Sequence, residues 1–410
     1  MNNMVVCQIK AFKNITFVNS FVIKNKLLKR NIEYFSIKIK NMKRLYILLF
    51  TIVACSLQAQ NKFNLVVGTY TNTCQSNGIY VYEFDTTTGN FKLKNSSENV
   101  LSPSYLSASA DNKFIYAVNE NGPQSTVSAF GYNAPSGKLT FLNKSDALGA
   151  DPCHLINDDK NVIAANYSGG SIVVFKKKTD GSITQVQQLL QHEGKGINEA
   201  RQEKAHVHMV CFSPDKKYVL SNDLGTDKVF IYNYNPDSKN EILTLKQTVD
   251  VKAGSGPRHL VFSKDGKFVY LVQELDATLT TFSYDKSGSL KIIAETSILA
   301  KDFKGGTSAA AIKISADGKF LYVTDRADVN AISTYKILKN GSIELVEQVS
   351  TLGKGPRDFA IDPSGNYLLV GHQYTNNIII FKRDKVTGKL TNTGKKIELC
   401  SPVGLIFTKS

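Results

Sequence analysis

The 410-residue sequence contains no tryptophan and only six cysteines, six histidines and four methionines. Without tryptophan it cannot carry the Trp-Asp signature of one large class of repeat proteins. It has no Cys-x-x-Cys pair, no His-x-x-x-His pair and no Asp-rich cage, which are the patterns typical of zinc and calcium sites. Gly169-Gly170 is not followed by the Lys-Ser or Lys-Thr of a phosphate-binding loop. We therefore expect no required metal and no other cofactor.

Long hydrophobic runs are scarce as well. The run LYILLFTIVA at 45–54 has ten residues, too few to cross a bilayer. Because it follows basic residues at 43–44 and precedes small residues near Ala59, it has the three parts of a cleavable secretory signal. An alternative is a lipoprotein, since the sequence IVAC could act as a lipidation box that anchors the chain through Cys55.

These features divide the chain into three parts. We expect residues 1–41 to come from a start codon assigned too early, residues 42–59 to be the signal peptide, and residues 60–410 to be the mature domain. The mature protein is then periplasmic or secreted, without a transmembrane helix. Residues 1–41 carry +7 and residues 43–44 add +2, so the formal net charge of +15 falls to +6. A surplus this small excludes a nucleic-acid-binding footprint.

The mature domain contains few cysteines, and their spacing is irregular. They are Cys74, Cys153, Cys211 and Cys400. Export would permit a disulfide between two of them. A domain of this size has enough core without one, so we expect all four thiols to be free.

A repeat of about fifty residues fills the mature domain. Each unit has a short apolar strand opened by proline or a small residue, a tight turn into an alternating strand, a strand of the form xIxxF or xVxxY, and a glycine-led fourth strand. Asp-Gly and Ser-Gly between β-rich runs are typical of hairpins, because glycine accepts positive φ. The first strands are SPSYLSAS at 102, DPCHLIN at 151, AHVHMVCF at 205, GPRHLVF at 256, SAAAIKI at 308, GPRDFAI at 355 and SPVGLIF at 401.

The spacing of the units predicts the fold. The turns, which start at 110, 158, 214, 264, 316 and 363, are 47 to 56 residues apart. Four short strands per unit at this spacing predict an all-β fold, a seven-bladed β-propeller, since a solenoid repeat would be shorter or helical. The C-terminal SPVGLIF is a first strand with nothing after it, whereas NLVVGTYT and GIYVYEF are later strands without a first. We expect the two ends to share one blade, which leaves no open edge.

Equivalent positions of the repeat predict which side chains face the central funnel. The start of each first strand and the end of each second strand approach the propeller axis, where a charged side chain is costly unless it is paired or binds a ligand. Counting back from the turn selects Ser104, His208, Arg258, Ala310 and Arg357, with Cys153 nearby, and counting forward selects Glu120, Tyr167, Leu224, Glu274, Arg326 and Gln373. His206 and His208 alternate along a strand, and we expect His208 to face the funnel.

Five motifs then carry a resemblance to a known family: ANYSGGSIVVF, RQEKAHVH, GPRHLVFSKDGKFVYLVQEL, DGKFLYVTDR and GPRDFAIDPSGNYLLV. Together they resemble the propeller-type lactonases, which include the bacterial 6-phosphogluconolactonases and the fungal carboxymuconate lactonizing enzymes. The resemblance covers about residues 63–408. It implies a hydrolase that opens a sugar lactone, with 6-phosphoglucono-1,5-lactone as the first expectation.

The resemblance also implies a catalytic site. The family's His, Arg, Glu and second Arg fall on residues that the repeat positions also select, namely His208 in HVH, Arg258 in GPRH, Glu274 in VQEL and Arg326 in TDR. Lactone hydrolysis needs an activated water, a stabilised acyl oxygen and a protonated leaving oxygen. We assign Glu274 as general base and His208 as proton donor to the leaving oxygen. The two arginines would bind the oxyanion, or a phosphate or carboxylate of the substrate.

Further residues are expected to line the substrate. These substrate-binding candidates are Glu120, Tyr167, Arg201, His206, Arg357 and Gln373. We interpret Cys153 as a small buried residue and not as a nucleophile. Two departures from the family bear on substrate placement more than on chemistry: Ala309-Ala310-Ala311 stands where many relatives have a glutamate, and Asp325-Arg326-Ala327 where Asn-Arg-Gly is usual.

Three other interpretations stay open at this stage. Arg258 and Glu274 could form only a structural ion pair between neighbouring strands. The substrate could be an unphosphorylated aldonolactone, since phosphorylated gluconolactone is cytoplasmic and this chain is expected to be exported. The chain could also be a non-catalytic binding propeller, because YVTD at 322–325 resembles surface-layer repeats, although the different polar residue at each axial position favours a site. As partner we expect a small-molecule sugar lactone and no nucleic acid, with the protein a monomer.

Overall fold

The computed structural model describes residues 24–40, 42–43 and 61–410. It divides the chain into two compact units, the first ending at Gln60 and the second running from Asn61 to Ser410. All the β-structure of the described residues belongs to the second unit. The second unit alone therefore carries the expected repeat domain.

The expected leader falls mostly outside the described residues. Of the residues expected upstream of the signal, 24–40 are helical, but the signal peptide at 42–59 is described only at 42–43, and Cys55 is not described. Among the residues that the structure describes, no helix is long and apolar enough to cross a membrane. The start-site, signal and lipidation hypotheses stay predictions.

Residues 61–410 form seven four-stranded antiparallel sheets, here named blades I to VII. Blade I consists of β28 (Pro402–Lys409), β1 (Lys62–Thr69), β2 (Ile79–Asp85) and β3 (Phe91–Ser96). Blade II consists of β4 (Leu106–Ala108), β5 (Phe114–Asn119), β6 (Thr126–Asn133) and β7 (Lys138–Asp146). Blade III consists of β8 (Pro152–Asn157), β9 (Asn161–Asn166), β10 (Ser171–Lys177) and β11 (Ile183–Gln191). Blades IV and V consist of β12 (Val207–Phe212), β13 (Tyr218–Asp223), β14 (Lys228–Tyr234) and β15 (Leu243–Asp250), and of β16 (Pro257–Phe262), β17 (Phe268–Gln273), β18 (Thr278–Tyr284) and β19 (Leu290–Ser297). Blade VI consists of β20 (Ala309–Ile314), β21 (Phe320–Asp325), β22 (Ala331–Ile337) and β23 (Ile343–Ser350). Blade VII consists of β24 (Pro356–Ile361), β25 (Tyr367–His372), β26 (Asn377–Arg383) and β27 (Leu390–Glu398). A short 3₁₀ turn, η1 (Gly122–Gln124), follows β5 in blade II.

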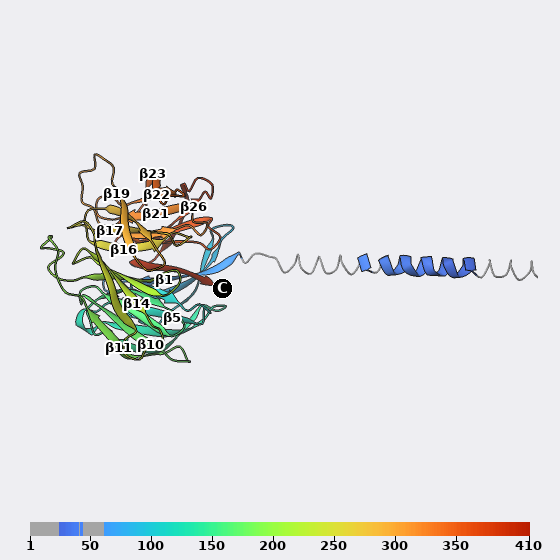
Figure 1. Cartoon of the computed structure of the whole chain (residues 1–410), viewed down its shortest axis with the longest axis horizontal. Coiled ribbons are helices and arrows are strands. Elements are labelled where there is room, and N and C mark those ends of the chain that lie inside the picture. Colours follow the sequence, from blue (N-terminus) through green and yellow to red (C-terminus); the bar gives the residue numbers. More distant parts are fainter. Residues whose placement is uncertain (1–23, 41, 44–60) are drawn as a thin grey trace, which may run out of the picture. The chain divides into compact units, whose positions relative to one another are not determined.

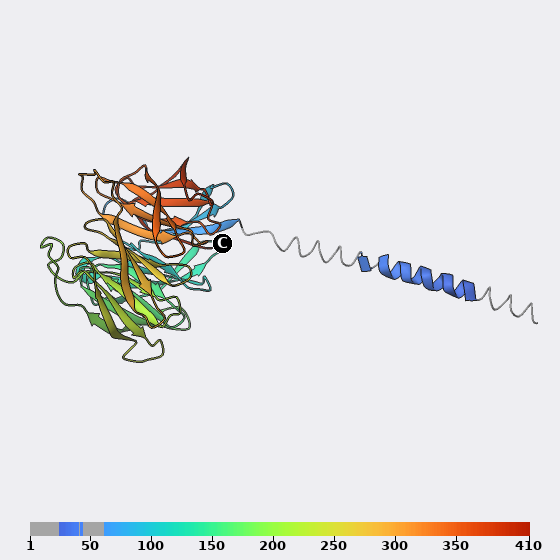
Figure 2. The ribbon, with the colours of Figure 1, turned by 45° about the horizontal axis from the view of Figure 1, so that its top comes forward.

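The first strands of the blades surround a common axis. Each of them contacts the first strand of the next blade, so that β28, β4, β8, β12, β16, β20 and β24 form a closed circle. Figures 1 and 2 show the resulting succession of blades, with the fourth strands, such as β11 and β19, toward the outside. The predicted seven-bladed β-propeller is therefore confirmed.

A local hydrogen-bond motif forms the turn between the first and second strands. In blade V, Ser263 Oγ donates to Asp265 Oδ1 at 2.7 Å and accepts the N–H of Phe268 at 3.0 Å. Gly266 completes the turn at φ +68°, a left-handed conformation that a side chain disfavours. The same serine and aspartate recur in blades II, IV and VI. Short-range chemistry thus sets the register of the first hairpin in these four blades.

The core lies between blades and not within one. Among residues 61–410, each cluster of buried apolar side chains joins two neighbouring sheets; Leu65 and Phe84 of blade I, for example, pack with Leu369 and Ile380 of blade VII. The other pairs of neighbouring blades are joined in the same way. Because burying such a side chain contributes about 1.5–3 kcal/mol, a blade is stable only with both neighbours in place.

The two ends of the domain meet in blade I. Strand β28 pairs antiparallel with β1, with Val66 opposite Ile406 and Leu65 opposite Phe407. The C-terminus accordingly lies beside β1 (Figure 1). The predicted closure by a shared blade is confirmed, and the hydrogen bonds of β1 and β28 tie the start of the ring to its end.

A disulfide adds a covalent link at the same place. Cys74, in the loop after β1, is bonded to Cys400, which precedes β28, while Cys153 and Cys211 are free. Our expectation that all four thiols are free was wrong for this pair. The reason is geometric: ring closure brings residues 326 positions apart in sequence to a Cα–Cα distance of 5.9 Å, which is within the range that a disulfide spans.

The disulfide yields a stability prediction. Replacing both cysteines, Cys74→Ser with Cys400→Ser, should lower the melting temperature by about 3–6 °C, because the cross-link restricts the unfolded chain by roughly 2–4 kcal/mol. Differential scanning calorimetry measures the change, with Cys211→Ser, which removes a free thiol, as the control. Equal melting temperatures for wild type and the double variant would show that strand pairing alone closes the ring.

Candidate functional site

A β-bulge at the start of the first strand leaves one residue out of the strand ladder in nearly every blade. In blade V, Pro257 pairs with Gln273 and His259 pairs with Val272, so Arg258 has no partner. An extra residue of this kind re-aims its side chain, here on a strand that lines the axis. The residues left out in the other blades are Cys153, His208, Arg357 and Val403, and the pair Ala310 and Ala311.

One backbone hydrogen bond fixes the end of each second strand beside the bulge. In blade V, the N–H of Glu274 donates to the carbonyl of Gly256, two residues before Arg258, at 2.7 Å. The equivalent donors in blades II, III, IV, VI and VII are Glu120, Tyr167, Leu224, Arg326 and Gln373. The positions obtained by counting along the repeat are therefore structurally equivalent.

Blade I supplies a seventh member of this ring, Tyr70, which the sequence analysis missed. Its N–H donates to the carbonyl of Ser401 at 3.1 Å, as Glu274 does to Gly256. Counting within one repeat could not find it, because the first and second strands of blade I lie at opposite ends of the sequence. Aligning NLVVGTYT with the other second strands would have identified it.

Glu274 gathers three arginines from three different parts of the fold. Its Oε2 lies 2.9 Å from Arg258 Nε of the same blade and 2.9 Å from Arg326 Nη2 of blade VI. Its Oε1 accepts a hydrogen bond of 2.7 Å from Arg201, in the loop between β11 and β12. His208 Nε2 lies 3.9 Å from Oε2. We name His208, Arg258, Glu274 and Arg326 the axial cluster.

The backbone of blade VI holds the two arginines of the axial cluster from the other side. Arg258 Nη1 donates to the carbonyl of Ala310 at 2.5 Å, and Arg326 Nε donates to the carbonyl of Ser308 at 3.1 Å. The stretch Ala309-Ala310-Ala311, which departs from the family, therefore supplies carbonyl oxygens that accept hydrogen bonds from these arginines. The second departure, Asp325, accepts bonds from the Thr307 hydroxyl and the Ser308 N–H, and so fixes this segment.

Electrostatics set the protonation states of the axial cluster. Burial favours the neutral acid, but Arg326 and Arg258 together hold the pKa of Glu274 well below its usual range. Burial and the neighbouring Arg326 lower the pKa of Arg258 to about 9. Burial and Arg258 lower the pKa of His208 well below its usual value. Near neutral pH the cluster thus holds a carboxylate, two guanidinium cations and a neutral imidazole.

The two histidines of HVH point to different surroundings. His208 Nδ1 lies 3.6 Å from Cys153 Sγ, and burial raises the pKa of that thiol. His206 instead stacks on the Tyr167 ring at 4.6 Å, and its Nε2 lies 3.1 Å from Glu203. His208 is therefore the histidine of the axial cluster, whereas His206 supports Tyr167, and the neutral Cys153 thiol fits its interpretation as a buried residue.

A long loop between β11 and β12 delivers Arg201. Gln202 anchors it, with its Nε2 donating to the carbonyl of Leu224 at 2.8 Å and its Oε1 accepting the Asn198 N–H at 3.1 Å. Arg201 Nη2 also donates to the Tyr167 hydroxyl at 3.2 Å. The Arg201 side chain is 42% exposed, compared with 6% for that of Glu274. Arg201 and Tyr167 therefore form the solvent-facing border of the axial cluster.

A second group of polar side chains surrounds Glu120. The Tyr70 hydroxyl donates to Glu120 Oε1 at 3.0 Å, and Ser104 Oγ donates to the same oxygen. The Arg357 guanidinium lies over the Tyr70 ring at 5.4 Å, and among residues 61–410 it has no hydrogen-bond or ion-pair partner. Gln373, in the same blade as Arg357, has a buried Oε1 without a donor among those residues. These groups are available to a ligand.

The axial site as a whole carries surplus positive charge. Among the side chains at the repeat positions, together with Arg201, there are four arginines and two carboxyl groups, Glu274 and Glu120. The nearby carboxyls of Asp151 and Asp325 accept backbone N–H groups, those of Gly122 and Ser308. Guanidinium groups bind planar oxyanions through paired hydrogen bonds. No group of three or more potential metal ligands occurs among the described residues. The arrangement is therefore suited to a small anion, or to a carbonyl oxygen that gains negative charge.

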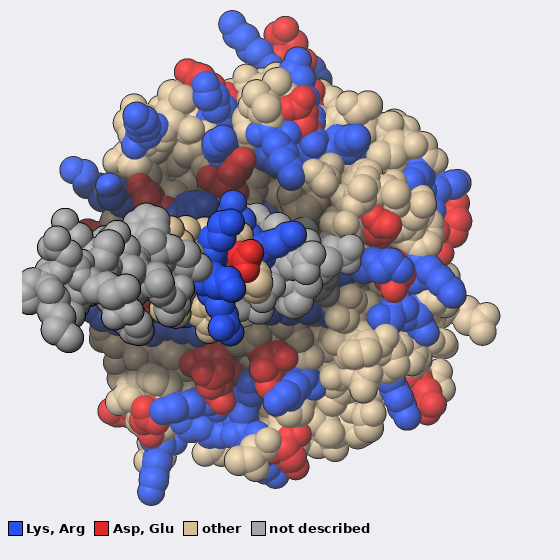
Figure 3. All heavy atoms as spheres, turned by 90° about the vertical axis from the view of Figure 1, so that its right-hand side faces the viewer, with Lys and Arg blue, Asp and Glu red and all other residues tan. Residues whose placement is uncertain are grey.

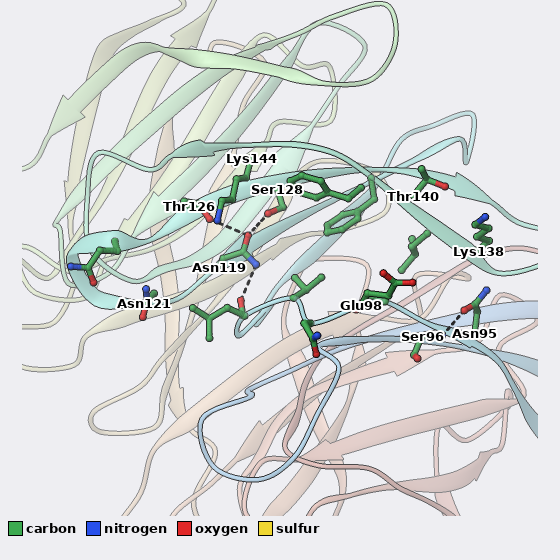
Figure 4. Close-up of a pocket in the computed structure, with 18 residues that line it drawn as sticks. Asn95, Ser96, Glu98, Asn119, Asn121, Thr126, Ser128, Lys138, Thr140 and Lys144 are labelled. Carbon is green, nitrogen blue, oxygen red and sulfur yellow. Dashed lines mark hydrogen bonds between the residues drawn. The ribbon is translucent and has the colours of Figure 1, made fainter.

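A separate groove of about 710 Å³ lies between the outer strands of blades I and II. Figure 4 shows its lining, in which Asn119 bonds to Thr126 and Ser128. The charged groups of this lining, Glu98, Lys138 and Lys144, form no ion pair with one another. Around the rim of the face in Figure 3, basic side chains are interspersed with acidic ones. The axial site therefore differs from this groove in having charged side chains that contact one another.

The surplus charge yields a binding prediction. Inorganic phosphate at about a hundredfold excess over its Kd should raise the melting temperature by roughly 3–4 °C, because it binds the folded protein only. Arg357→Gln removes the unpaired cation and should abolish most of this shift in differential scanning fluorimetry. Lys382→Gln, an exposed change in the same blade, serves as the control. Equal shifts in wild type and Arg357→Gln would contradict an anion site at this arginine.

Comparison with known proteins places these features in a family. Residues 64–407 match the model of the family described as "Lactonase, 7-bladed beta-propeller". The chain is 34% identical to a 6-phosphogluconolactonase of Bacillus subtilis over 345 residues, which cover 83% of this chain and 97% of the relative. A crystal structure from Bacteroides fragilis has a TM-score of 0.82 and 39% identity, covering 86% of this chain and 99% of that one. The periplasmic gluconolactonase of Pseudomonas aeruginosa has a TM-score of 0.80 and 34% identity, covering 84% and 99%. The chain belongs to the seven-bladed β-propeller lactonase family.

Proposed function

We propose that this enzyme hydrolyses a sugar lactone, with 6-phosphoglucono-1,5-lactone as substrate and 6-phosphogluconate as product. Membership of the lactonase family makes the chain a lactone-opening enzyme. The observation that carries the substrate class is the convergence of Glu274, three arginines and a neutral histidine at the axis. A non-catalytic binding propeller is not favoured, because a scaffold has no need for buried charge of this kind.

The proposed oxyanion site consists of Arg258 and Arg326. Lactone opening puts negative charge on the carbonyl oxygen, and donors fixed in advance stabilise that charge best. Both guanidinium groups are held by Glu274 and by carbonyl oxygens of blade VI, so neither has to reorient during the reaction. Their directions are therefore set before the substrate arrives.

The contacts of Glu274 favour a role different from general base. Its two oxygens already contact three guanidinium groups, and its pKa is held well below the usual range. A carboxylate stabilised in this way accepts a proton poorly. We propose that Glu274 positions the arginines, while neutral His208 donates a hydrogen bond to the leaving ring oxygen.

The phosphate of the proposed substrate has a partner in Arg357. This guanidinium is half-buried and has no ion-pair partner among residues 61–410, so it can pair with a dianion without losing an existing contact. Arg201 borders the same site and is partly exposed. Two cations outside the oxyanion pair suit a phosphorylated substrate.

A second candidate is an unphosphorylated aldonolactone in an exported enzyme. The Cys74–Cys400 disulfide favours it, because structural disulfides persist in oxidising compartments. The predicted signal at 42–59 and the likeness to a periplasmic gluconolactonase agree with export. In that case Arg357 would bind the carboxylate of the product.

A lactone panel tests both candidates. Rates of opening, measured above the spontaneous background, should give a kcat/KM at least about tenfold higher for 6-phosphoglucono-1,5-lactone than for glucono-1,5-lactone, since one ion pair is worth that much. Glu274→Gln should lower kcat/KM by about 10²-fold or more, because the arginines lose their anchor.

The control is Glu344→Gln, an exposed glutamate in blade VI, which should match wild type. A preference for the unphosphorylated lactone would support the second candidate. Opening of no lactone would overturn the proposed function. If Glu274→Gln lowers the melting temperature but each folded molecule turns over substrate at nearly the wild-type rate, Glu274 and Arg258 form only a structural ion pair.

A further inference from the structure

Two carboxyl groups occupy the same repeat position on opposite sides of the axis. Glu120 follows the second strand of blade II, and Glu274 follows the second strand of blade V. In a ring of seven, these blades are separated by two blades on one side and three on the other. Both backbone N–H groups donate to a carbonyl that precedes the first strand of their own blade, that of Ser102 for Glu120 and that of Gly256 for Glu274. The fold therefore holds the two carboxyls in equivalent settings and leaves their neighbours to distinguish them.

The neighbours of the two carboxyls differ in kind. Glu274 contacts three guanidinium groups and is 5% exposed. Glu120 is half-buried and contacts only hydroxyl groups, those of Tyr70 and Ser104. Among residues 61–410, no arginine or lysine forms an ion pair with Glu120 as arginines do with Glu274, and Arg357 acts on it only from a longer distance. Glu120 can therefore gain a proton without breaking an ion pair, whereas Glu274 cannot.

The charged and titratable groups that face Glu120 come from three other blades. They are Tyr70 of blade I, Asp151 and Cys153 of blade III, and Arg357 of blade VII. Burial raises the pKa of Glu120, and Asp151 adds to the rise, while Arg357 and the hydroxyls of Ser104 and Tyr70 oppose it. Burial also raises the pKa values of the Tyr70 phenol and the Cys153 thiol, so both stay neutral.

The members of the axial cluster are poor proton carriers near neutral pH. Glu274 is held as a carboxylate, His208 as a neutral imidazole, and the arginines as cations. Where two carboxyls lie in environments that push their pKa values apart, the one with the raised value is suited to proton transfer. The geometry singles out Glu120 for that task.

We propose that Glu120 is the catalytic acid–base of lactone opening and that Glu274 is a positioning residue for the arginines. This inference rests on the proposed lactonase function and assigns its proton transfers. It makes Glu120, a residue of blade II, part of the reaction machinery, and not only a contact to the substrate.

The proton balance of the reaction closes with this one carboxyl. Ionised Glu120 takes a proton from water while the water oxygen forms a bond to the lactone carbonyl carbon, and the π electron pair moves onto the oxygen facing Arg258 and Arg326. When that pair returns, the bond from the carbonyl carbon to the ring oxygen breaks. Its electrons pass to the ring oxygen, which takes the proton back from Glu120. The carboxylate is regenerated, and the product acid releases its own proton to solvent.

The pH dependence of kcat/KM tests the assignment. In wild type it should fall as the pH drops through the pKa of Glu120, above the usual glutamate value of about 4.3, because only the carboxylate accepts a proton. Glu120→Gln should lower kcat/KM by about 10²–10⁴-fold and remove this acid limb. Glu98→Gln, an exposed change in the loop after β3, is the control and should match wild type.

A second variant keeps the test decisive if Glu120→Gln does not fold. Tyr70→Phe removes one hydrogen bond to the carboxylate, so the pKa of Glu120 should rise and the acid limb should move to higher pH by roughly 0.5–1 unit. A residue with only a structural role would not move this limb.

The outcomes separate the inference from the function on which it rests. A folded Glu120→Gln variant within about threefold of wild type, or an acid limb unmoved by Tyr70→Phe, would overturn the role of Glu120 while leaving the lactonase function intact. Absence of lactone opening by wild type would instead overturn the proposed function itself.

Discussion

Three guanidinium groups can face the same axis only because the Glu274 carboxylate lies among them. Each cation loses hydration on burial, and unpaired buried charges would cost several kcal/mol each. Glu274 offsets this cost by contacting all three, and the carbonyl oxygens of Ser308 and Ala310 take further N–H groups of Arg326 and Arg258. The arginines are thereby held in fixed directions, and the proposed stabilisation of the oxyanion depends on that fixation.

The propeller repeats its backbone but not its axial side chains. The bulge that leaves Arg258 out of the ladder in blade V leaves out His208 in blade IV and Arg357 in blade VII. Equivalent backbone positions can thus hold chemically different side chains without a change of fold. On the Glu274 side the charges are paired, whereas on the Glu120 side Arg357 and Gln373 still have unused hydrogen-bonding capacity. This asymmetry gives the site one side that is fixed and one side that can engage a ligand.

The sequence predicted the fold well because its signals are local. In four blades the serine and aspartate of the turn lie within five residues of the strand they start, so the pattern carries the register with it. The equivalence of the positions around the axis was also predicted, since the bulge occurs at a similar count in most units. Tyr70 was missed because blade I is divided between the two ends of the chain.

Other features of the site depend on contacts that no local pattern encodes. The disulfide joins residues 326 positions apart, which only ring closure brings together. The sequence suggested a general base at Glu274 because spacing does not show how many arginines contact this carboxylate. One of them, Arg201, comes from a loop outside the repeat. Protonation in a site of this kind follows from the full set of neighbours, which sequence spacing does not give.

The opposite electrostatic environments of the two axial carboxyls can be measured without any substrate. Carbon-13 NMR of glutamate-labelled protein, with Glu120→Gln and Glu274→Gln used for assignment, would follow both carboxyl signals from about pH 3 to pH 8. We expect Glu274 to stay ionised while exposed glutamates titrate, and Glu120 to titrate at a higher pH than they do. Titration of Glu274 at or above the exposed glutamates would contradict this expectation.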